Sequence, residues 1–376
     1  MVALVAISGL AQAREGNVFS LKLSELLQYD DNIFRLSPDA DNRQVLGSDR
    51  RDDFISSTTV ALDANKQVGR HNFYGELSYT QVLFQEFRRL DYTGENSRLG
   101  WSGGFGAANN WDVYFKRSAT QSDFADLQTA LSNVVTTDTI GGSMSIRVAS
   151  DWVVRPALSE DKYSNSADSR KSSDGSARHT SLNFGYRPHS GNALEAQYRH
   201  LDRDYDVGGG FRQKEIGVLG VWMPSSASVL EIRGARLVQK TKISGGNGNF
   251  SQQVGHFNYR WQTSGASTLN FRVFRELSSV NIVGAEQDAL ARGVTGVWSW
   301  TPLAKVKFDS TYDYRKRTFQ QITLRDKTRT ASLGATYFPD PALSLQAIVK
   351  NERRKADPNS REYEAQSYSL SLQYSF

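Results

Sequence analysis

The last nine residues of the chain alternate between two kinds of side chain, and no other feature restricts the fold as strongly. Positions 368, 370, 372, 374 and 376 carry Tyr, Leu, Leu, Tyr and Phe, whereas 369, 371, 373 and 375 carry serine or glutamine. Successive side chains of a β-strand point to opposite faces. The segment is therefore predicted to be a strand with one apolar face and one polar face.

The same alternation recurs upstream, although the mean hydropathy of the chain does not reveal it. The mean hydropathy is −0.51, and no run approaches the roughly 18 apolar residues of a membrane-spanning helix. A barrel wall places its apolar residues at every second position, so it scores as polar on average. The further alternating segments are 73–79, 99–105, 111–115, 144–148, 182–186, 194–198, 230–233, 269–273, 306–312, 333–337 and 343–347.

The connections between these segments are of two kinds, and the two kinds alternate along the chain. Eight are short, with turn residues, at 66–69, 107–110, 149–151, 188–192, 224–227, 264–266, 302–304 and 339–341. Nine are longer and more charged, at 28–53, 83–92, 118–136, 163–177, 203–212, 239–252, 277–289, 316–328 and 352–362. Short turns at one end and long loops at the other are typical of outer-membrane barrels.

Together these patterns predict an all-β fold, a transmembrane antiparallel up-and-down β-barrel in the bacterial outer membrane. Seventeen connections imply eighteen strands, and sixteen is the alternative because the register of the first strand is uncertain. An even number puts both termini on the periplasmic side. The final strand also resembles the closing strand of such barrels, which implies that Tyr374 and Phe376 are read by the barrel-assembly machinery.

The N-terminus predicts a processing signal. Residues 1–10 are apolar and small, and Ala11, Gln12 and Ala13 match a small-x-small cleavage site. Residues 1–13 are therefore interpreted as the remnant of a signal peptide and residues 14–376 as the barrel. The alternative is an ordinary disordered terminus.

The alternation also assigns the two faces of the wall. The apolar positions face lipid, and several aromatic residues beside short turns fit an interfacial girdle better than a sandwich core. These outward residues are Trp101, Phe105, Trp111, Phe115, Trp152, Phe184, Tyr186, Trp222, Trp261, Trp298, Trp300, Tyr337, Tyr374 and Phe376.

The inward positions are polar and carry more bases than acids. The bases are Lys22, Arg98, Lys116, Arg147, Arg155, Arg187, Arg199, Arg233, Arg260, Arg272, Lys305, Lys307 and Lys350. The acids are Glu76, Asp112, Glu195, Glu231, Asp309 and Asp313. Such a lumen would favour anions. The alternative is a structural ladder of cross-strand ion pairs, for example Arg233 with Glu231 and Lys307 with Asp309.

No catalytic, metal or cofactor site is predicted. The five histidines are scattered without metal spacing, and no glycine-rich phosphate loop precedes a helix. His200 with Asp202, Asp204 and Asp206 is the nearest catalytic arrangement, and a solvated loop explains it better. The loop 28–53, the longest, is expected to fold inward as a constriction.

One short segment resembles a known family. It comprises Tyr29, Asp30, Asp31, Asn32, Phe34 and Arg35 within the sequence YDDNIFR. This segment, the length and the C-terminus resemble the EpsL-type outer-membrane barrels of exopolysaccharide loci, which are regarded as exopolysaccharide transporters. Asp and Asn at such a position favour a turn and also suit sugar hydroxyls or a cation. A plain turn that ends the strand is the alternative.

The resemblance implies an outer-membrane channel that exports an extracellular polysaccharide without catalysis, with inward Tyr74 and Tyr114 stacking on sugar rings. The alternative function is a general or anion-preferring diffusion porin for small solutes. The expected partners are outer-membrane lipid, the barrel-assembly machinery, a polysaccharide whose acidic forms suit the basic lining, and periplasmic polysaccharide-export components. Nucleic acid is not expected, because the bases alternate with apolar residues instead of forming a surface stripe.

Overall fold

The computed structural model describes residues 18–106, 108–242, 249–282, 285–357 and 361–376. They form one closed antiparallel sheet of eighteen strands in which each strand pairs with its neighbours in the sequence and β1 pairs with β18. The first nine strands are β1 Phe19–Asp30, β2 Asp53–Val68, β3 His71–Phe84, β4 Tyr92–Phe105, β5 Asn109–Gln121, β6 Val134–Ala149, β7 Trp152–Asn165, β8 Gly175–Tyr186 and β9 Ala193–Tyr205. The others are β10 Gly210–Ser225, β11 Ser228–Thr241, β12 Phe250–Ser264, β13 Ser267–Ile282, β14 Ala285–Leu303, β15 Val306–Phe319, β16 Arg325–Asp340, β17 Leu343–Asp357 and β18 Tyr363–Ser375.

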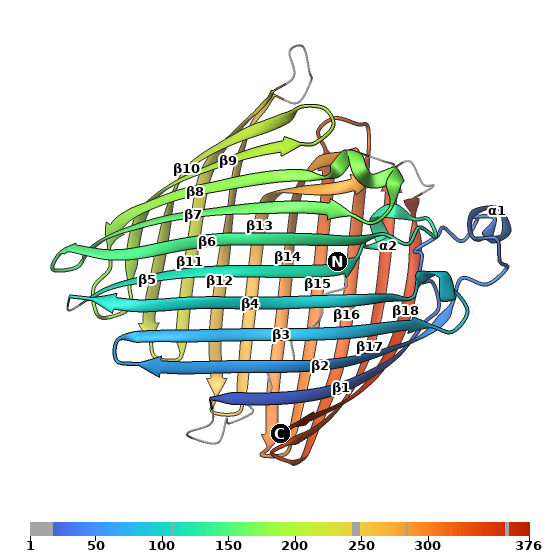
Figure 1. Cartoon of the computed structure of the whole chain (residues 1–376), viewed down its shortest axis with the longest axis horizontal. Helices are drawn as coiled ribbons and strands as arrows, with labels where there is room; N and C mark the ends of the chain where they lie inside the picture. Colours follow the sequence, from blue (N-terminus) through green and yellow to red (C-terminus); the bar gives the residue numbers. More distant parts are fainter. Residues whose placement is uncertain (1–17, 107, 243–248, 283–284, 358–360) are drawn as a thin grey trace.

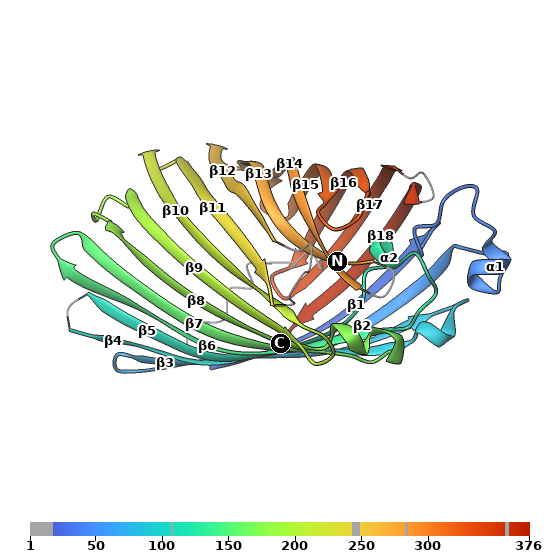
Figure 2. The same ribbon diagram turned by 90° about the horizontal axis from the view of Figure 1, so that it is seen from above.

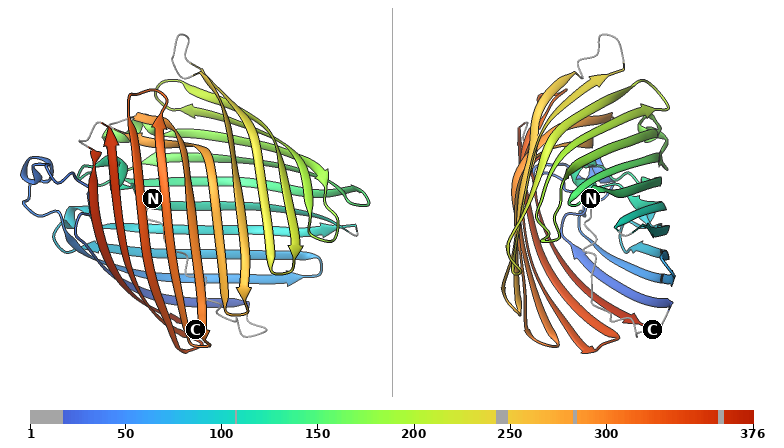
Figure 3. Two further views of the ribbon diagram at one scale, coloured as in Figure 1. Left: turned by 180° about the vertical axis from the view of Figure 1, so that it is seen from behind. Right: turned by 90° about the vertical axis from the view of Figure 1, so that its left-hand side faces the viewer.

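The barrel is flattened, and the strands of its two broad walls cross (Figures 1 and 3). The predicted eighteen-stranded up-and-down barrel is confirmed, and the sixteen-stranded alternative is wrong. Closure leaves no free sheet edge, so the backbone polar groups of the wall find partners within the sheet. Register Lys22↔Ser375 and Asp30↔Ser367 closes the barrel between its first and last strands.

The short turns lie together at one end of the barrel and the longer loops at the other. Phe19 and Ser375 also lie at the short-turn end, because β1 and β18 run antiparallel with Lys22 opposite Ser375. That this end faces the periplasm stays a prediction. The predicted signal remnant, residues 1–13, lies outside the described residues.

Four short helical segments occur among the described residues, all in the longer loops. They are α1 Asn42–Leu46, η1 Arg88–Leu90, α2 Phe124–Leu127 and η2 Asp168–Ser173. None of the helices in the described ranges is long and apolar enough to span a membrane. Helix α1 projects beyond the strands, whereas α2 lies at the mouth of the barrel (Figures 1 and 2).

The outer face carries the apolar residues that the alternation predicts. Trp101 stacks on Phe73 at 5.7 Å, Trp152 on Phe184 at 5.2 Å and Trp300 on Phe308 at 5.7 Å between ring centroids. Such rings are exposed on the barrel because lipid covers this face in place of protein. An eighteen-stranded closed barrel with an apolar outer face is typical of the bacterial outer membrane and indicates that location.

Most of the loops are shorter than predicted, because the strands continue past the end of the apolar alternation. The clearest error is 277–289, because most of this range belongs to two strands. β13 runs through it to Ile282 and β14 begins at Ala285. The inner side of this hairpin buries Val280 and Ala289 against Phe319 and Leu324. Apolar residues on the inner face there broke the pattern used to find strands. Likewise, Asp204 of the predicted loop 203–212 lies within β9, as do His200 and Asp202, and only Asp206 of this group lies in the loop.

Candidate channel and its mouth

Most of the bases predicted to face inward are neutralised by carboxylates. Nine of the thirteen have such a partner, so the ladder of ion pairs is real over much of the wall. The pairs are Lys22–Asp63, Arg147–Asp151, Arg155–Glu195, Arg187–Glu195, Arg199–Glu215, Arg233–Glu215, Arg272–Glu276, Lys307–Asp309 and Lys350–Glu352.

Several of these acids were missing from the sequence-based list of inward residues. Glu215, Glu276 and Glu352 occupy inner positions of β10, β13 and β17, closer to the long loops than the segments used to define the faces. Arg233 therefore pairs with Glu215 and not with its predicted partner Glu231. The excess of positive charge in the lumen is consequently smaller than the sequence suggested.

Arg98, Lys116, Arg260 and Lys305 have no carboxylate within salt-bridge distance among the described residues. Lys305 lies in a turn and donates to the carbonyl of Pro339 at 2.8 Å. Arg260 occupies an inner position of β12. Arg315, an exposed inner residue of β15 that the sequence-based list missed, also lacks a carboxylate partner in that part of the chain and lies 5.8 Å from the ring centroid of Phe274.

Arg98 and Lys116 face tyrosine rings on the inner wall of β3–β5. The guanidinium of Arg98 lies 5.0 Å from the centroid of Tyr74, and the ammonium of Lys116 lies 4.7 Å from that of Tyr114. The Tyr74 hydroxyl donates to Asp112 at 2.7 Å, which fixes its ring. A cation over an aromatic face is held without being neutralised. These two side chains therefore keep their charge available to a solute.

A cavity of about 460 Å³ adjoins this cluster on the inner wall. Tyr114, His179, Arg199, Gln213 and Glu215 contribute to its lining. A second cavity, of about 330 Å³, continues along the wall and shares Arg199 and Glu215 with the first. The lumen thus offers aromatic, cationic and hydrogen-bonding groups side by side.

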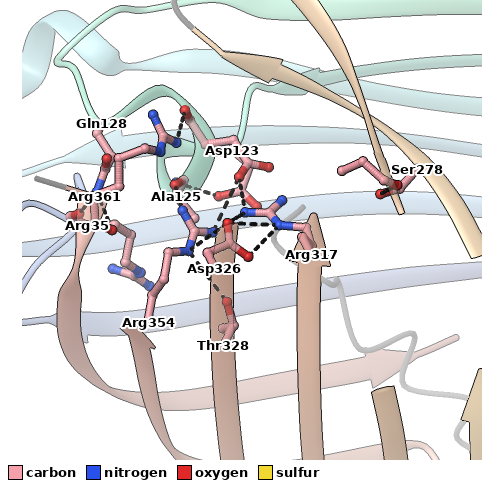
Figure 4. Close-up of polar contacts among 12 residues, drawn as sticks. Arg35, Asp123, Ala125, Gln128, Ser278, Arg317, Asp326, Thr328, Arg354 and Arg361 are labelled. Atoms are coloured by element: carbon pink, nitrogen blue, oxygen red, sulfur yellow. Dashed lines mark hydrogen bonds and ion pairs between the residues drawn. The ribbon is translucent and has the colours of Figure 1, made fainter. Parts of the chain in front are cut away.

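The loop 122–133, between β5 and β6, crosses the mouth. Of the predicted loop 28–53, only the turn around Phe34 packs against it, with the ring centroids of Phe34 and Phe124 5.1 Å apart, whereas α1 projects outward (Figure 1). Helix α2 of the loop 122–133 begins after Asp123, whose side chain accepts from the backbone N–H of Ala125 at 2.8 Å. From there it reaches the wall of β15–β17 (Figure 4), where Asp126 accepts from Arg317 at 2.9 Å and from Arg354 at 3.3 Å. Composition gave no signal for this, because 28–53 is the longer and more charged loop.

The clamp on α2 is a buried charge cluster. Arg317 also donates to Asp326 at 2.7 Å, and Arg361 donates to the carbonyl of Asp126 at 2.7 Å. Burial acts to raise the pKa of the Asp126 carboxyl, but Arg317 and Arg354 outweigh it and hold that pKa below its usual range. The carboxylate is therefore ionised at neutral pH.

The family-like segment forms a buried turn beside this clamp. Asp30, which is 2% exposed, accepts from Arg35 at 2.8 and 2.9 Å. The side chain of Asn32 donates to the carbonyl of Leu36 at 2.9 Å and accepts from its N–H at 2.9 Å. Although burial disfavours its charged form, Asp30 raises the pKa of Arg35. Phe34 is fully buried.

The remaining members of that segment also make structural contacts. Asp31 accepts from the N–H of Gln366 at 2.7 Å, and Tyr29 packs on Phe54 with ring centroids 4.9 Å apart. The carbonyl of Arg35 accepts from Gln128 at 2.6 Å, which joins the turn to the α2 loop. These contacts describe the turn alternative, and binding of sugar or a cation here stays a prediction. The described ranges contain no cluster of three or more side chains that could hold a metal ion.

Comparison with known proteins gives the fold. No protein-family model matches the chain, and neither does any curated protein. Among solved structures, Pseudomonas aeruginosa OpdK with vanillate aligns at a TM-score of 0.53 and 11% identity, over 95% of this chain and 98% of that one. P. aeruginosa OccK2 (OpdF) in complex with glucuronate gives 0.53 and 11%, over 95% and 97%. P. aeruginosa OccK9 (OpdG) gives 0.52 and 12%, over 95% and 97%. The chain is therefore similar in fold to these outer-membrane barrels over nearly its whole length.

Proposed function

We propose that this barrel is a diffusion porin that admits small organic anions across the outer membrane. One observation carries the proposal: Arg98 and Lys116 lie over tyrosine rings, without carboxylate partners among the described residues, beside a cavity of about 460 Å³. Cations on a low-dielectric wall attract and concentrate anions. Cavities of this size suit small organic solutes.

The structural neighbours support the same solute class. OpdK was solved with vanillate and OccK2 with glucuronate, and both compounds are carboxylates. The inner wall of this chain has groups suited to such molecules: tyrosine faces for a ring, and Arg98 and Lys116 for a carboxylate. Nine of the predicted inward bases are already paired, so we expect preference for anions and not strict exclusion of cations.

Export of an exopolysaccharide, which the family resemblance implies, has less support. The YDDNIFR segment uses its side chains to hold a buried turn, and the loop that carries α2 occupies the mouth. Tyr74 and Tyr114 would suit sugar rings as well as aromatic acids. Loss of surface polysaccharide on deletion of the gene, with no change in uptake of small acids, would favour export over the porin.

The test is ion selectivity in planar bilayers. In a gradient of potassium chloride, the wild-type barrel is expected to give a reversal potential that shows a preference for chloride over potassium. The double variant Arg98→Gln/Lys116→Gln is expected to reduce this preference severalfold without closing the pore. The matched control is Arg117→Gln, an outward residue of β5 that pairs with Glu95 at 3.2 Å, which should leave selectivity unchanged. A cation-selective wild type would contradict the proposal.

A further inference from the structure

A row of five cations crosses five consecutive strands on the outer face near the long-loop end. The register pairs Arg275 of β13 with Arg292 of β14, Arg292 with Lys316 of β15, Lys316 with Lys327 of β16 and Lys327 with Lys355 of β17. We call these five residues the basic stripe. Neighbouring strands lie about 4.8 Å apart, so each charge is next to another of the same sign.

The stripe faces outward, away from the lumen. Each member shares its face with exposed apolar residues of its own strand, such as Val273, Trp298, Tyr312, Leu333 and Val349. Their neighbours in the chain point the other way and are buried: Phe274, Ala291, Arg317, Asp326 and Arg354. The stripe therefore adjoins the apolar band, at the level where a membrane's headgroups begin.

No member of the stripe has a carboxylate partner in the part of the chain that the structure describes. The nearest acids are Asp357 and Glu364, which lie opposite Arg325 and Arg353, and Glu362, whose carboxylate accepts from the backbone N–H of Ala356 at 3.4 Å, next to Lys355. Elsewhere on the outer face, several cations on β5, β8 and β10 have carboxylate partners, although Lys214, Arg236 and Lys240 have none among the described residues. Arg117 lies 3.2 Å from both Glu95 and Asp138, Arg178 lies 3.2 Å from Glu160, and Arg212 lies 3.3 Å from Asp202.

Like charges directly opposite one another destabilise a sheet. The five like charges of the basic stripe therefore repel one another, and no carboxylate of the described residues offsets this repulsion. The cations on β4–β10 that pair with carboxylates do not have this cost. An external polyanion with several charges spaced at a few ångströms would relieve the repulsion within the basic stripe. Arg329 and Arg353, paired with each other one step nearer the apolar band, enlarge the positive surface on that side.

We infer that the basic stripe binds the phosphate groups of the outer-leaflet glycolipid, the lipid A portion of lipopolysaccharide. Its acyl chains would lie on the apolar band below, and its phosphates would accept charge-assisted hydrogen bonds from Arg and Lys side chains. This assignment requires the long loops to face outward, as predicted. It goes beyond the porin function and does not depend on it.

The experiment measures lipid A bound to the refolded full-length barrel by native mass spectrometry. The test variant carries Arg292→Gln, Lys316→Gln and Lys327→Gln, and the control carries Arg117→Gln, Arg178→Gln and Arg212→Gln, so each loses three outward positive charges. At about 1 kcal/mol for each cation near an anionic surface, the test variant should bind lipid A roughly a hundredfold more weakly. The control should bind within a fewfold of wild type.

Three results would overturn the inference: equal binding by the test variant and wild type, an equal loss in the control, or wild-type binding that is as tight to dephosphorylated lipid A or to phosphatidylglycerol. Folding is monitored by heat-modifiable gel mobility, and without lipid A the test variant should be at least as heat-resistant as wild type because repulsion is removed. Bilayer selectivity in phospholipid should not change in the test variant, so failure here and failure of the porin proposal are separable.

Discussion

Asp126→Asn probes the clamp that holds α2 in the mouth of the barrel. The carboxylate of Asp126 contacts two guanidinium groups, at 2.9 Å from Arg317 and 3.3 Å from Arg354. The side chains of both arginines are nearly buried, with relative exposures of 6% and 4%. Asparagine keeps the shape but removes the charge, so the arginines lose one of their two carboxylate partners, and Asp326 remains.

Removing one partner of a buried ion pair costs about 3–5 kcal/mol. We expect a somewhat smaller cost, about 2–4 kcal/mol, because Asp326 still compensates Arg317 and because Asp126 is partly exposed. At 1.36 kcal/mol per tenfold change, the equilibrium between docked and released α2 should shift toward release by roughly 30- to 1,000-fold.

Amide hydrogen exchange reads this equilibrium directly, because exchange in a protected loop follows the population of its open state. Peptides that cover 122–133 should exchange faster by the same factor in the variant, while peptides from β15–β17 keep their protection. Single-channel conductance should rise or lose its closed periods. The matched control is Asp49→Asn, which removes an exposed ion pair with Arg43 and should change nothing.

Unchanged exchange in 122–133 would refute the clamp, since the buried charges would then contribute nothing to docking. Faster exchange with unchanged conductance would keep the clamp but remove the loop from the conduction path. Loss of protection in β15–β17 as well would mean that the variant disturbs the wall, and Asp326→Asn would then serve as the comparison for damage at that wall.

Three further predictions follow from the same structure. Arg317 and Arg354 depress the pKa of Asp126, so the docking of α2 should be constant from pH 8 to about 5 and weaken only as the pH falls below about 4. Conductance measured against pH checks this, and a transition near neutrality would contradict it. Asn32→Ala removes a buried side chain with hydrogen bonds to Leu36 and should lower the free energy of unfolding by about 2–3 kcal/mol. The effect would be seen as a lower temperature for heat-modified mobility, whereas Asn110→Ala, at an exposed position, should not show it. Leu333→Arg, on the lipid face at 67% exposure, should cost about 2–4 kcal/mol of folding free energy in bilayers, unlike Val207→Arg in a loop at 66% exposure, and equal costs would disprove the assigned outer face.

The wall could be predicted from the sequence because a single local rule determines it. Alternation of the kind seen in 368–376 specifies strand and face together, and turn residues then give the order of connections. The register Tyr368↔Tyr29, which closes the barrel, follows once all strands are antiparallel neighbours. Strand ends were less predictable, since β13 and β14 continue into a hairpin whose inner face is apolar.

The mouth could not be predicted in this way, because its contacts join segments far apart in the sequence. Asp126 and Arg354 are 228 positions apart, and nothing in the local sequence around α2 distinguishes it from a solvated loop. The acids on the inner wall were missed for a related reason. Glu215 and Glu352 lie beyond the apolar alternation. A rule based on the hydrophobic period cannot assign a face to residues there, because it needs apolar residues at every second position.

Beyond the end of the apolar alternation, the two faces of the barrel differ in how their charged residues are paired. Near the long loops both faces become charged, but inner charges are enclosed by the wall and by loops, where an unpaired charge is costly. Arg317, Arg354 and Arg233 accordingly have carboxylate partners. The outer cations of β13–β17 have no such requirement from the protein, since their partner would come from the membrane. Buried inner charges that are paired, together with one sector of outer cations that are not, are therefore what a barrel that binds an anionic lipid on that sector should have.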